Sequence, residues 1–192
     1  MQSLDPRTTA LVLIDLQQGI LPFAKGPRTG DAVLETSARL AKRFRERGAL
    51  VVLVRVGWHD DFADSLALPA DQPTRLAPGM LPANWLDFPD ALEAGDKDLY
   101  ITKRQWGAFH GTELDLQLRR RGIRTIVLGG ISTNIGVEST SRVAYELGYE
   151  QVLVEDAMSA GATEHHDASV KFIFPRVGFV RQADEVLAAL GE

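Results

Sequence analysis

The chain has 192 residues, of which 45% are hydrophobic and 24% are charged, so its size and composition are those of one globular domain. Its formal net charge is -5, and it has no cluster of lysines and arginines, which makes nucleic acid and anionic membrane surfaces poor candidate partners. The absence of cysteine excludes disulfides, thiolate metal sites and thiol catalysis. Because the polar start and the short first apolar run offer neither a signal sequence nor a membrane span, we expect a cytoplasmic protein.

The first half of the chain predicts two buried strands, one helix and a long irregular segment. Residues 9–14 form an unbroken apolar run rich in branched side chains, which is typical of a strand buried on both faces. Apolar residues then recur at helical spacing over 31–47, and 50–55 is a second buried strand. The segment 57–96 is irregular and holds five of the nine prolines. So long a connection usually serves as a functional loop or a contact surface.

The second half alternates strands and helices. In chain order, we predict a strand at 99–102, a helix at 112–121, a strand at 124–128, a helix at 135–147, a strand at 152–155, a helix at 163–174, a strand at 178–181 and a helix at 183–190. This alternation implies parallel pairing, right-handed crossovers and helices on both faces of the sheet. We therefore expect a single three-layer α/β domain over residues 1–192, built on six parallel strands.

Polar residues fall where three of the predicted strands end. Asp15 ends the first strand, Lys103 follows the third, and a segment at 129–136 joins the fourth to its helix. Taken singly, each has a structural explanation as a turn residue, a solvated charge or a helix cap. Ligands of parallel sheets bind beyond the carboxyl ends of the strands, so the joint placement of these residues predicts an active site. We expect the carboxyl of Asp15 and the ammonium of Lys103 to lie within about 4 Å of each other.

Three motifs at this edge carry a family resemblance. They are Ile-Asp-Leu-Gln at 14–17, Lys103 with Trp-Gly-Ala-Phe-His-Gly-Thr at 106–112, and Gly-Ile-Ser-Thr-Asn-Ile-Gly-Val-Glu-Ser-Thr at 130–140. In order and spacing, the motifs resemble those of the isochorismatase-like hydrolase superfamily over essentially the whole chain. The resemblance implies a parallel sheet of order 3-2-1-4-5-6 and hydrolysis of a small molecule. It also implies a non-prolyl cis peptide between Gly130 and Ile131.

The resemblance places Gly136 where most members have a nucleophilic cysteine. Those members hydrolyse amides with an Asp-Lys-Cys triad, whose first two residues correspond to Asp15 and Lys103. The isochorismatases proper also have glycine at this position, and they cleave a vinyl ether without a nucleophilic side chain. In that reaction a carboxyl protonates the enol-ether methylene, water captures the oxocarbenium carbon, and the hemiketal breaks down to pyruvate and an alcohol. The resemblance thus implies general acid catalysis by Asp15, which is worth about 10²–10⁴-fold.

The sequence leaves the protonation of Asp15 open, because an adjacent Lys103 lowers the pKa of a carboxyl and burial raises it. The conflict is resolved if Lys103 faces the carboxylate or the ether oxygen of the bound substrate. We expect a substrate carboxylate to bind the backbone amides at the start of the helix after the fourth strand, around Ser132, Thr133 and Ile135.

Gly136 would leave room for the substrate beside these amides. Trp106, Phe109 and Phe23 are candidates for an apolar wall of the site. The alternative is that all three aromatic residues belong to the core.

Two other functions remain open. The first is amide hydrolysis with Thr133, Ser132 or Ser139 in place of the thiol, although the sequence shows no histidine base beside them. The second is a binding or interaction protein that has lost catalysis. The retention of Asp15 and Lys103 argues against it, because a buried charged pair costs stability.

We expect neither a metal nor a cofactor. Nicotinamidases of the superfamily bind a divalent metal through an Asp and paired histidines after the second strand. This chain has His59 and Asp60 there and no second histidine nearby. As partners we expect a small-molecule substrate and a second copy of the chain, in a homodimer or homotetramer. The segment 58–96 would contribute to the interface, because Trp85, Leu86 and Phe88 are hard to bury within one domain of this size.

Overall fold

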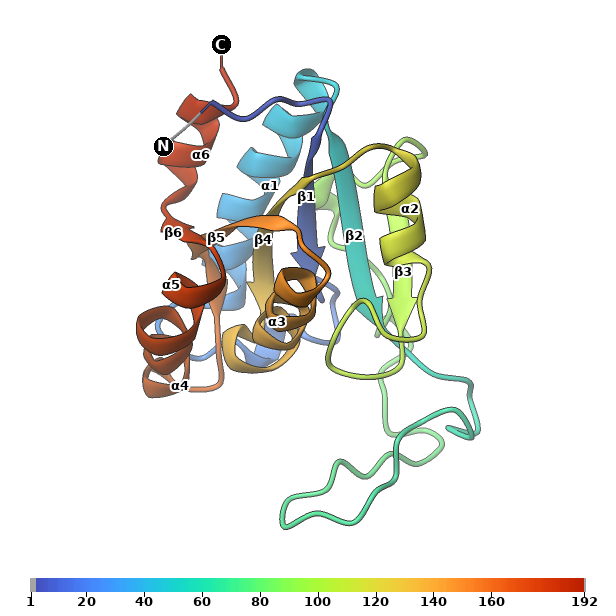
Figure 1. Ribbon diagram of the computed structural model, residues 1–192. Helices are drawn as coiled ribbons and strands as arrows, with labels where there is room; N and C mark the ends of the chain where they lie inside the picture. Colours follow the sequence, from blue (N-terminus) through green and yellow to red (C-terminus); the bar gives the residue numbers. More distant parts are fainter. Residues whose placement is uncertain (1–2, 192) are drawn as a thin grey trace.

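Six parallel strands form one sheet in the computed structural model, which describes residues 3–191 (Figure 1). The strands are β1 (Thr9–Ile14), β2 (Leu50–Val56), β3 (Leu99–Lys103), β4 (Thr125–Ile131), β5 (Glu150–Ser159) and β6 (Phe179–Arg181). Their order is β3-β2-β1-β4-β5-β6, and every pair of neighbours is parallel. The expected α/β class, strand direction and strand order are confirmed.

Helices cover both faces of this sheet. The helices are α1 (Gly30–Glu46), α2 (Leu114–Arg120), α3 (Glu138–Glu146), α4 (Thr163–Ala168), α5 (Phe174–Val177) and α6 (Ala183–Ala189). Helices α1 and α6 share one hydrophobic core, and α2, α3 and α5 share the other. None of the helices in residues 3–191 is long and apolar enough to cross a membrane.

Strand β1 shows why the first apolar run is unbroken. Leu11 and Leu13 pack into the core beneath α1, whereas Val12 and Ile14 pack into the opposite core. Successive side chains of a strand point to opposite faces, so a strand covered on both sides has no polar positions to alternate with.

Several predicted elements differ in extent from those of the structure. The strand predicted at 152–155 extends to Ser159, because Glu155 and Asp156 interrupt its apolar pattern without ending it. The helix predicted at 135–147 begins as a π-helical turn, Thr133–Val137, before α3. The helix predicted at 163–174 is likewise divided by a π-helical turn, Ser169–Ile173, between α4 and α5.

The predicted position of the cis peptide is wrong by one residue. The non-prolyl cis bond joins Ile131 to Ser132, not Gly130 to Ile131. Gly130 instead adopts a φ of 126°, and a Cβ at this residue would lie 2.1 Å from the carbonyl oxygen of Ile14. Only glycine fits where the backbone of β4 lies so close to that of β1.

An irregular arm, residues 59–82, extends from the carboxyl ends of β1–β3 away from the body (Figure 1). Contrary to expectation, the chain itself partly covers the three apolar residues that follow the arm. Trp85 donates its indole N–H to the carbonyl of Val56 at 2.8 Å, Leu86 contacts Gly57, and Phe88 packs against Tyr100. The arm itself has three exposed large apolar side chains, those of Leu66, Leu68 and Met80, which are 62%, 71% and 60% exposed.

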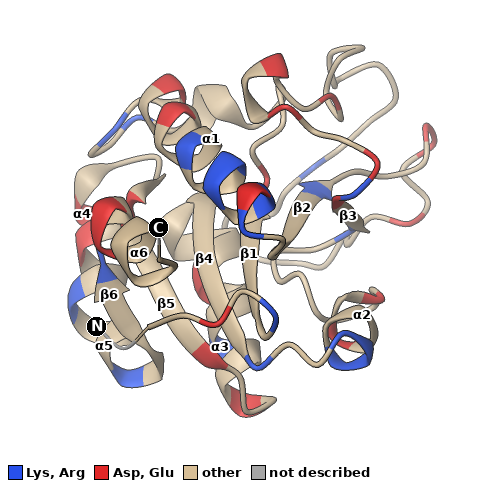
Figure 2. Cartoon of the chain, turned by 90° about the horizontal axis from the view of Figure 1, so that it is seen from above, with Lys and Arg blue, Asp and Glu red and all other residues tan. Residues whose placement is uncertain are grey.

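The arginines at the end of α2 form no isolated basic patch. Arg119 pairs with Asp115 at 3.2 Å, and its guanidinium lies over the ring of Tyr149. Arg121 is bonded to Gln117. Figure 2 shows blue and red segments lying close together on both α1 and α2.

Candidate active site

A cavity of about 660 Å³ opens at the carboxyl ends of the central strands. Asp15, Lys103 and Gly136 line it from three separate segments, which follow β1, end β3 and follow β4. The rule that ligands bind beyond the strand ends therefore locates the cavity correctly. The arm closes part of its remaining wall.

Asp15 takes an unusual backbone conformation at the end of β1. Its φ is 53°, in the left-handed region, and its backbone N–H donates to the carbonyl of Val54 at 2.9 Å. Residues held in such conformations cluster at functional sites. The residue is only 5% exposed. Its Oδ1 is buried without a hydrogen-bond partner among residues 3–191, whereas Oδ2 is bonded to Lys103.

The ammonium of Lys103 is fully engaged within the protein. Its Nζ donates to Oδ2 of Asp15 at 2.7 Å, to the carbonyl of Gln105 at 3.2 Å and to the carbonyl of Trp106 at 2.8 Å. A lysine ammonium has three N–H donors, and here each has an acceptor. The expected approach of Asp15 and Lys103 within about 4 Å is confirmed. In this arrangement, Lys103 keeps no donor for a substrate.

The structure gives the direction in which the pKa of Asp15 is shifted, which the sequence left open. Burial raises the pKa of Asp15 from 3.8 to about 6, even though the charge of Lys103 and its hydrogen bond act to lower it. Desolvation of the carboxylate therefore outweighs the neighbouring cation. Asp15 can exchange a proton near neutral pH.

Gly136 faces this pair from the π-helical turn. A Cβ on Gly136 would lie 3.2 Å from Oδ2 of Asp15, 3.5 Å from Nζ of Lys103 and 2.9 Å from Cγ2 of Ile14. The position is thus close enough for a side chain to touch both charged groups, and it is too tight for one to enter without displacing Ile14.

Of the six residues expected to bind substrate, the structure places four on the cavity wall: Phe23, Trp106, Ser132 and Ile135. Phe109 and Thr133 do not line it. Phe109 is buried in the core and stacks on Tyr149, with ring centroids 5.8 Å apart. Its apolar character alone did not distinguish a wall position from a core position.

The backbone amides expected to hold a carboxylate are partly occupied. The N–H groups of Ile135 and Val137 both donate to the carbonyl of Ser132, at 3.1 and 3.2 Å. An anion at this turn would have to compete with these bonds.

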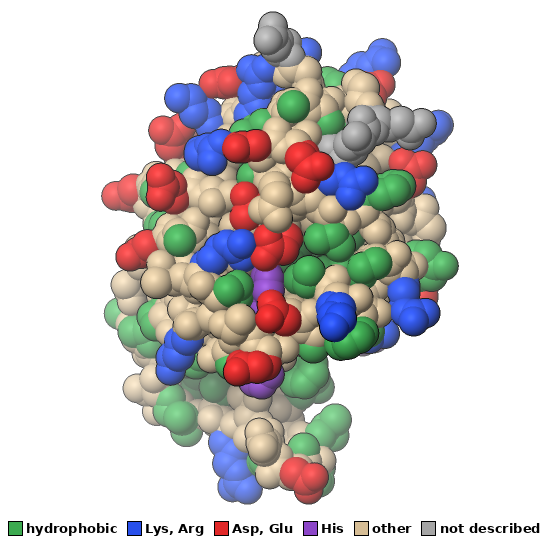
Figure 3. Space-filling view, turned by 90° about the vertical axis from the view of Figure 1, so that its left-hand side faces the viewer, with side chains coloured by type: hydrophobic (Ala, Val, Ile, Leu, Met, Phe, Trp, Pro, Cys, Tyr) green, Lys and Arg blue, Asp and Glu red, His purple; other side chains and the backbone are tan. Residues whose placement is uncertain are grey.

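Thr133 belongs to a buried chain of hydrogen bonds that sequence reasoning missed. Its Oγ1 lies 2.9 Å from Nδ1 of His166, and Nε2 of His166 lies 3.0 Å from Oε1 of Glu155. Arg28 pairs with the same carboxylate at 3.0 Å. Hydrogen bonds from His166, and then from Arg28 and Gln182, lower the pKa of Glu155 to about 2. The link is buried, since His166 is 1% exposed, and the surface on the side of α4, α5 and α6 shows histidine side chains next to acidic ones (Figure 3).

The sequence also missed Trp58, Trp85 and Arg104, which line the cavity. Trp58 and Arg104 lie just beyond the ends of β2 and β3, so the strand-end rule could have found them. Trp85 returns to the cavity after the irregular arm, whose sequence has no period from which its path could be read.

His59 and Asp60 lie at the start of the arm. The side chain of His59 is 76% exposed and lies 3.8 Å from Asp64. Within residues 3–191 there is no group of three or more His, Cys, Asp or Glu side chains that could hold a metal ion.

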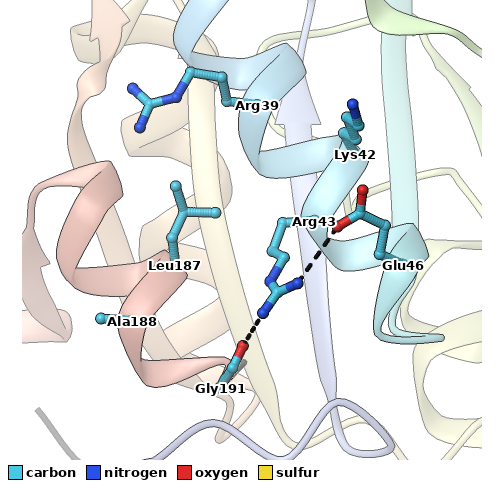
Figure 4. Close-up of a pocket in the computed structure, with 7 residues that line it drawn as sticks. All are labelled: Arg39, Lys42, Arg43, Glu46, Leu187, Ala188 and Gly191. Carbon is cyan, nitrogen blue, oxygen red and sulfur yellow. Dashed lines mark hydrogen bonds and ion pairs between the residues drawn. The ribbon is translucent and has the colours of Figure 1, made fainter.

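A second cavity, of about 410 Å³, lies between α1 and α6 (Figure 4). These helices cover the face of the sheet opposite to the one on which the side chain of Ile14 packs. Its basic side chains are largely paired. Arg43 is bonded to Glu46 and to the carbonyl of Gly191, and Arg39 pairs with Asp184 at 2.5 Å. None of the residues expected at the active site lines this groove.

The sequence is similar to those of proteins from one known family. The sequence model of the Isochorismatase domain family matches residues 9–185. The chain belongs to the isochorismatase family. It is 56% identical over 190 residues to the uncharacterized isochorismatase family protein YecD of Escherichia coli O157:H7, covering 99% of this chain and 100% of the relative.

Other relatives place this family member among hydrolases. The chain is 30% identical over 199 residues to the ureidoacrylate amidohydrolase RutB of Acinetobacter baylyi, covering 92% of this chain and 81% of the relative. The structure of an isochorismatase family protein from Burkholderia thailandensis superposes with a TM-score of 0.93 at 45% identity, with both chains fully covered. The protein is thus an isochorismatase-family hydrolase.

Proposed function

We propose that this hydrolase cleaves a small enol ether by proton transfer from Asp15, without a nucleophilic side chain. The observation that carries the proposal is the carboxyl of Asp15 at the cavity: its Oδ1 is buried without a hydrogen-bond partner among residues 3–191, and its Oδ2 lies beside Gly136, which has no side chain that could act as a nucleophile. The raised pKa of about 6 supports a proton on this carboxyl.

The reaction balances with one water molecule. Asp15 donates its proton to the terminal methylene carbon of the enol ether, and the carbon bearing the ether oxygen becomes an oxocarbenium centre. Water adds to that carbon and returns one proton to the Asp15 carboxylate. The hemiketal then loses the alcohol, leaving a ketone, or pyruvate when the substrate is an enolpyruvyl ether.

Lys103 acts in this proposal on the acid and not on the substrate. Its three donors hold Oδ2 of Asp15 and two backbone carbonyls, so it fixes the carboxyl with Oδ1 free. Gly136 leaves the carboxyl uncovered, because any side chain at this position would start 3.2 Å from Oδ2 of Asp15.

Rates on two probes test the proposal: α-phenoxyacrylate, an enol ether that yields phenol and pyruvate, and phenylacetamide, a simple amide. We expect wild type to hydrolyse the enol ether and Asp15→Asn to lose about 10²-fold or more of that rate, because Asn carries no acidic proton. Gly136→Cys should not speed the enol ether reaction. Efficient turnover of phenylacetamide by wild type, or an unchanged rate in Asp15→Asn, would refute the proposal.

One observation favours a second candidate, amide hydrolysis with Thr133 as nucleophile. The sequence offered no base beside this hydroxyl, but His166 lies 2.9 Å from it and is in turn bonded to Glu155. This is the order of nucleophile, base and acid found in hydrolytic triads. RutB of A. baylyi is named as an amidohydrolase, which is the reaction class this candidate would share.

The position of Thr133 counts against this second candidate. Its side chain is fully buried, and the residue does not line the cavity. Thr133→Val separates the two mechanisms, since a nucleophile role predicts complete loss of phenylacetamide hydrolysis. Under the acid mechanism the same variant leaves enol ether hydrolysis measurable.

We further propose that residues 1–192 form one domain, and that the protein acts in the cytoplasm as a homodimer or homotetramer on a small molecule, not on nucleic acid. The acidic net charge of -5 and the pairing of Arg119 with Asp115 on α2 support the choice of a small molecule.

A further inference from the structure

The cavity has a mainly apolar wall with few charged groups. The three tryptophans of the chain, Trp58, Trp85 and Trp106, all line it. Among the residues that line it, the charged ones are Asp15, Lys103 and Arg104. Apolar walls with a few placed polar groups are typical of small-molecule sites, where the polar groups set specificity.

The two groups that would first be expected to bind an anion are already engaged. Each donor of the Lys103 ammonium has an acceptor within the protein. At the start of the π-helical turn, the N–H groups of Ile135 and Val137 are bonded to the carbonyl of Ser132. An anionic substrate group would have to break bonds to use either.

Within the described residues, the guanidinium of Arg104 has one hydrogen-bond partner, Asp64. Its Nε donates to Oδ2 of Asp64 at 2.5 Å, and the backbone carbonyl of Arg104 accepts from the indole of Trp58 at 3.0 Å. Its Nη1 is buried, and no acceptor within residues 3–191 lies in hydrogen-bond range of it. The side chain as a whole is 36% exposed, so the unfilled Nη1 donor belongs to a guanidinium that borders the cavity, and a ligand acceptor that filled this donor would be stabilising.

Asp64 fixes the guanidinium from the arm side. Its other carboxylate oxygen accepts from the backbone N–H of His59 at 2.9 Å, so the acid is itself held in place. Binding through Nε leaves the outer nitrogens of Arg104 for a second acceptor. A planar guanidinium matches a carboxylate in a way that a lysine ammonium does not.

We propose that Arg104 binds a carboxylate of the substrate, and that the substrate class is a carboxylate with an apolar or aromatic body packed against the tryptophans. The inference rests on the proposed function in placing the substrate in this cavity. It concerns binding alone, so it is tested without turnover.

The test measures binding of a matched pair of probes, phenylacetate and phenylacetamide, by the change in tryptophan emission. Every tryptophan lines the cavity, so the emission reports its occupancy. We expect wild type to bind phenylacetate about tenfold more tightly than phenylacetamide, which corresponds to about 1.4 kcal/mol. In Arg104→Gln the ratio should fall to about one while the affinity for phenylacetamide is unchanged.

Two matched controls accompany the variant. Lys42→Gln removes a cation from the groove between α1 and α6 (Figure 4), and it should leave the ratio unchanged. Asp64→Asn removes the negative charge next to Arg104 and should raise the ratio, whereas Asp61→Asn on the same arm should not. Comparing Asp64→Asn with Asp61→Asn tests whether Arg104 binds the carboxylate even if Arg104→Gln disturbs the fold.

Equal affinity of wild type for the two probes, no measurable binding of phenylacetate, or a ratio that does not respond to Asp64→Asn would overturn the assignment. A carboxylate preference that depends on Arg104 in a protein with no hydrolytic activity toward α-phenoxyacrylate would support the assignment and reject the proposed reaction. The two failures are therefore distinguishable.

Discussion

At the scale of single residues, the pairing of Asp15 with Lys103 sets the pH at which the proposed acid works. A general acid must carry its proton, so the rate should fall as the pH rises through about 6. Lys103 lowers the pKa of Asp15 by its charge and its hydrogen bond. Removing that cation should raise the pKa further.

We therefore predict that Lys103→Met moves the titration of Asp15 to higher pH. The measurement is the carboxyl carbon resonance of Asp15 in NMR, assigned by its absence in Asp15→Asn. Lys42→Met, which changes an exposed cation on α1, should leave the midpoint in place. A midpoint that falls or stays constant in Lys103→Met would show that Lys103 does not set the acidity of Asp15.

Gly136 is closely surrounded by other atoms, and its lack of a side chain suits this position. We predict that Gly136→Ala lowers the free energy of unfolding by about 1–3 kcal/mol, because its Cβ would lie 2.9 Å from Cγ2 of Ile14 in a packed core. Denaturant titration checks this. Gly161→Ala is the control, since a Cβ there has nothing within 4 Å, and equal effects of the two variants would contradict the prediction.

At the scale of elements, the link from Thr133 through His166 to Glu155 joins the π-helical turn after β4, helix α4 and strand β5. Both outer groups depend on His166 for a hydrogen bond. We predict that His166→Asn lowers the free energy of unfolding by about 1–3 kcal/mol, because the buried hydroxyl of Thr133 loses its hydrogen-bond partner and Glu155 keeps only its bonds from Arg28 and Gln182. His165→Asn, at the exposed neighbouring position, should have little effect.

The dependence of the free energy of unfolding on pH, at acidic pH, is a second measurement that tests this link. The pKa of Glu155 is lowered from 4.5 to about 2, so its contribution to stability is present above pH 4.5 and is lost as the pH falls toward 2. In His166→Asn the pKa of Glu155 should move back toward 4.5. The variant should then lose less stability than wild type over that interval, and an equal loss would count against the link.

The helices and strands also explain which parts of the fold and of the site the sequence could predict. Apolar runs located the six strands because the sheet is covered on both faces, and the strand-end rule brought Asp15 and Lys103 together. The same reasoning missed Arg104, because in the sequence a charged residue next to a strand end looks like an ordinary solvated side chain. It missed His166 because this side chain lies among polar neighbours at 164–167, and the packing of α4 against β5 and the π-helical turn Thr133–Val137 buries it.

At the scale of the whole molecule, the arm is the feature that a single copy leaves unexplained. Sequence reasoning assigned the interface to Trp85, Leu86 and Phe88, but these pack at least partly against their own domain. Within the arm, the exposed large apolar side chains are those of Leu66, Leu68 and Met80, and two of them, Leu66 and Met80, also line the cavity. Apolar groups gathered on a projecting segment favour contact with another copy.

We predict that the protein associates into a dimer or tetramer through the arm, and that Leu68→Asp weakens this association. Leu68 is 71% exposed and does not line the cavity, so the substitution places a charge in the interface and leaves the wall of the site unchanged. Light scattering at micromolar concentration measures the mass of each form. Leu116→Asp on α2, at a side chain 48% exposed, serves as the matched control and should keep the wild-type mass. A monomeric wild type would refute association, and a loss of mass in Leu116→Asp alone would move the interface from the arm to α2.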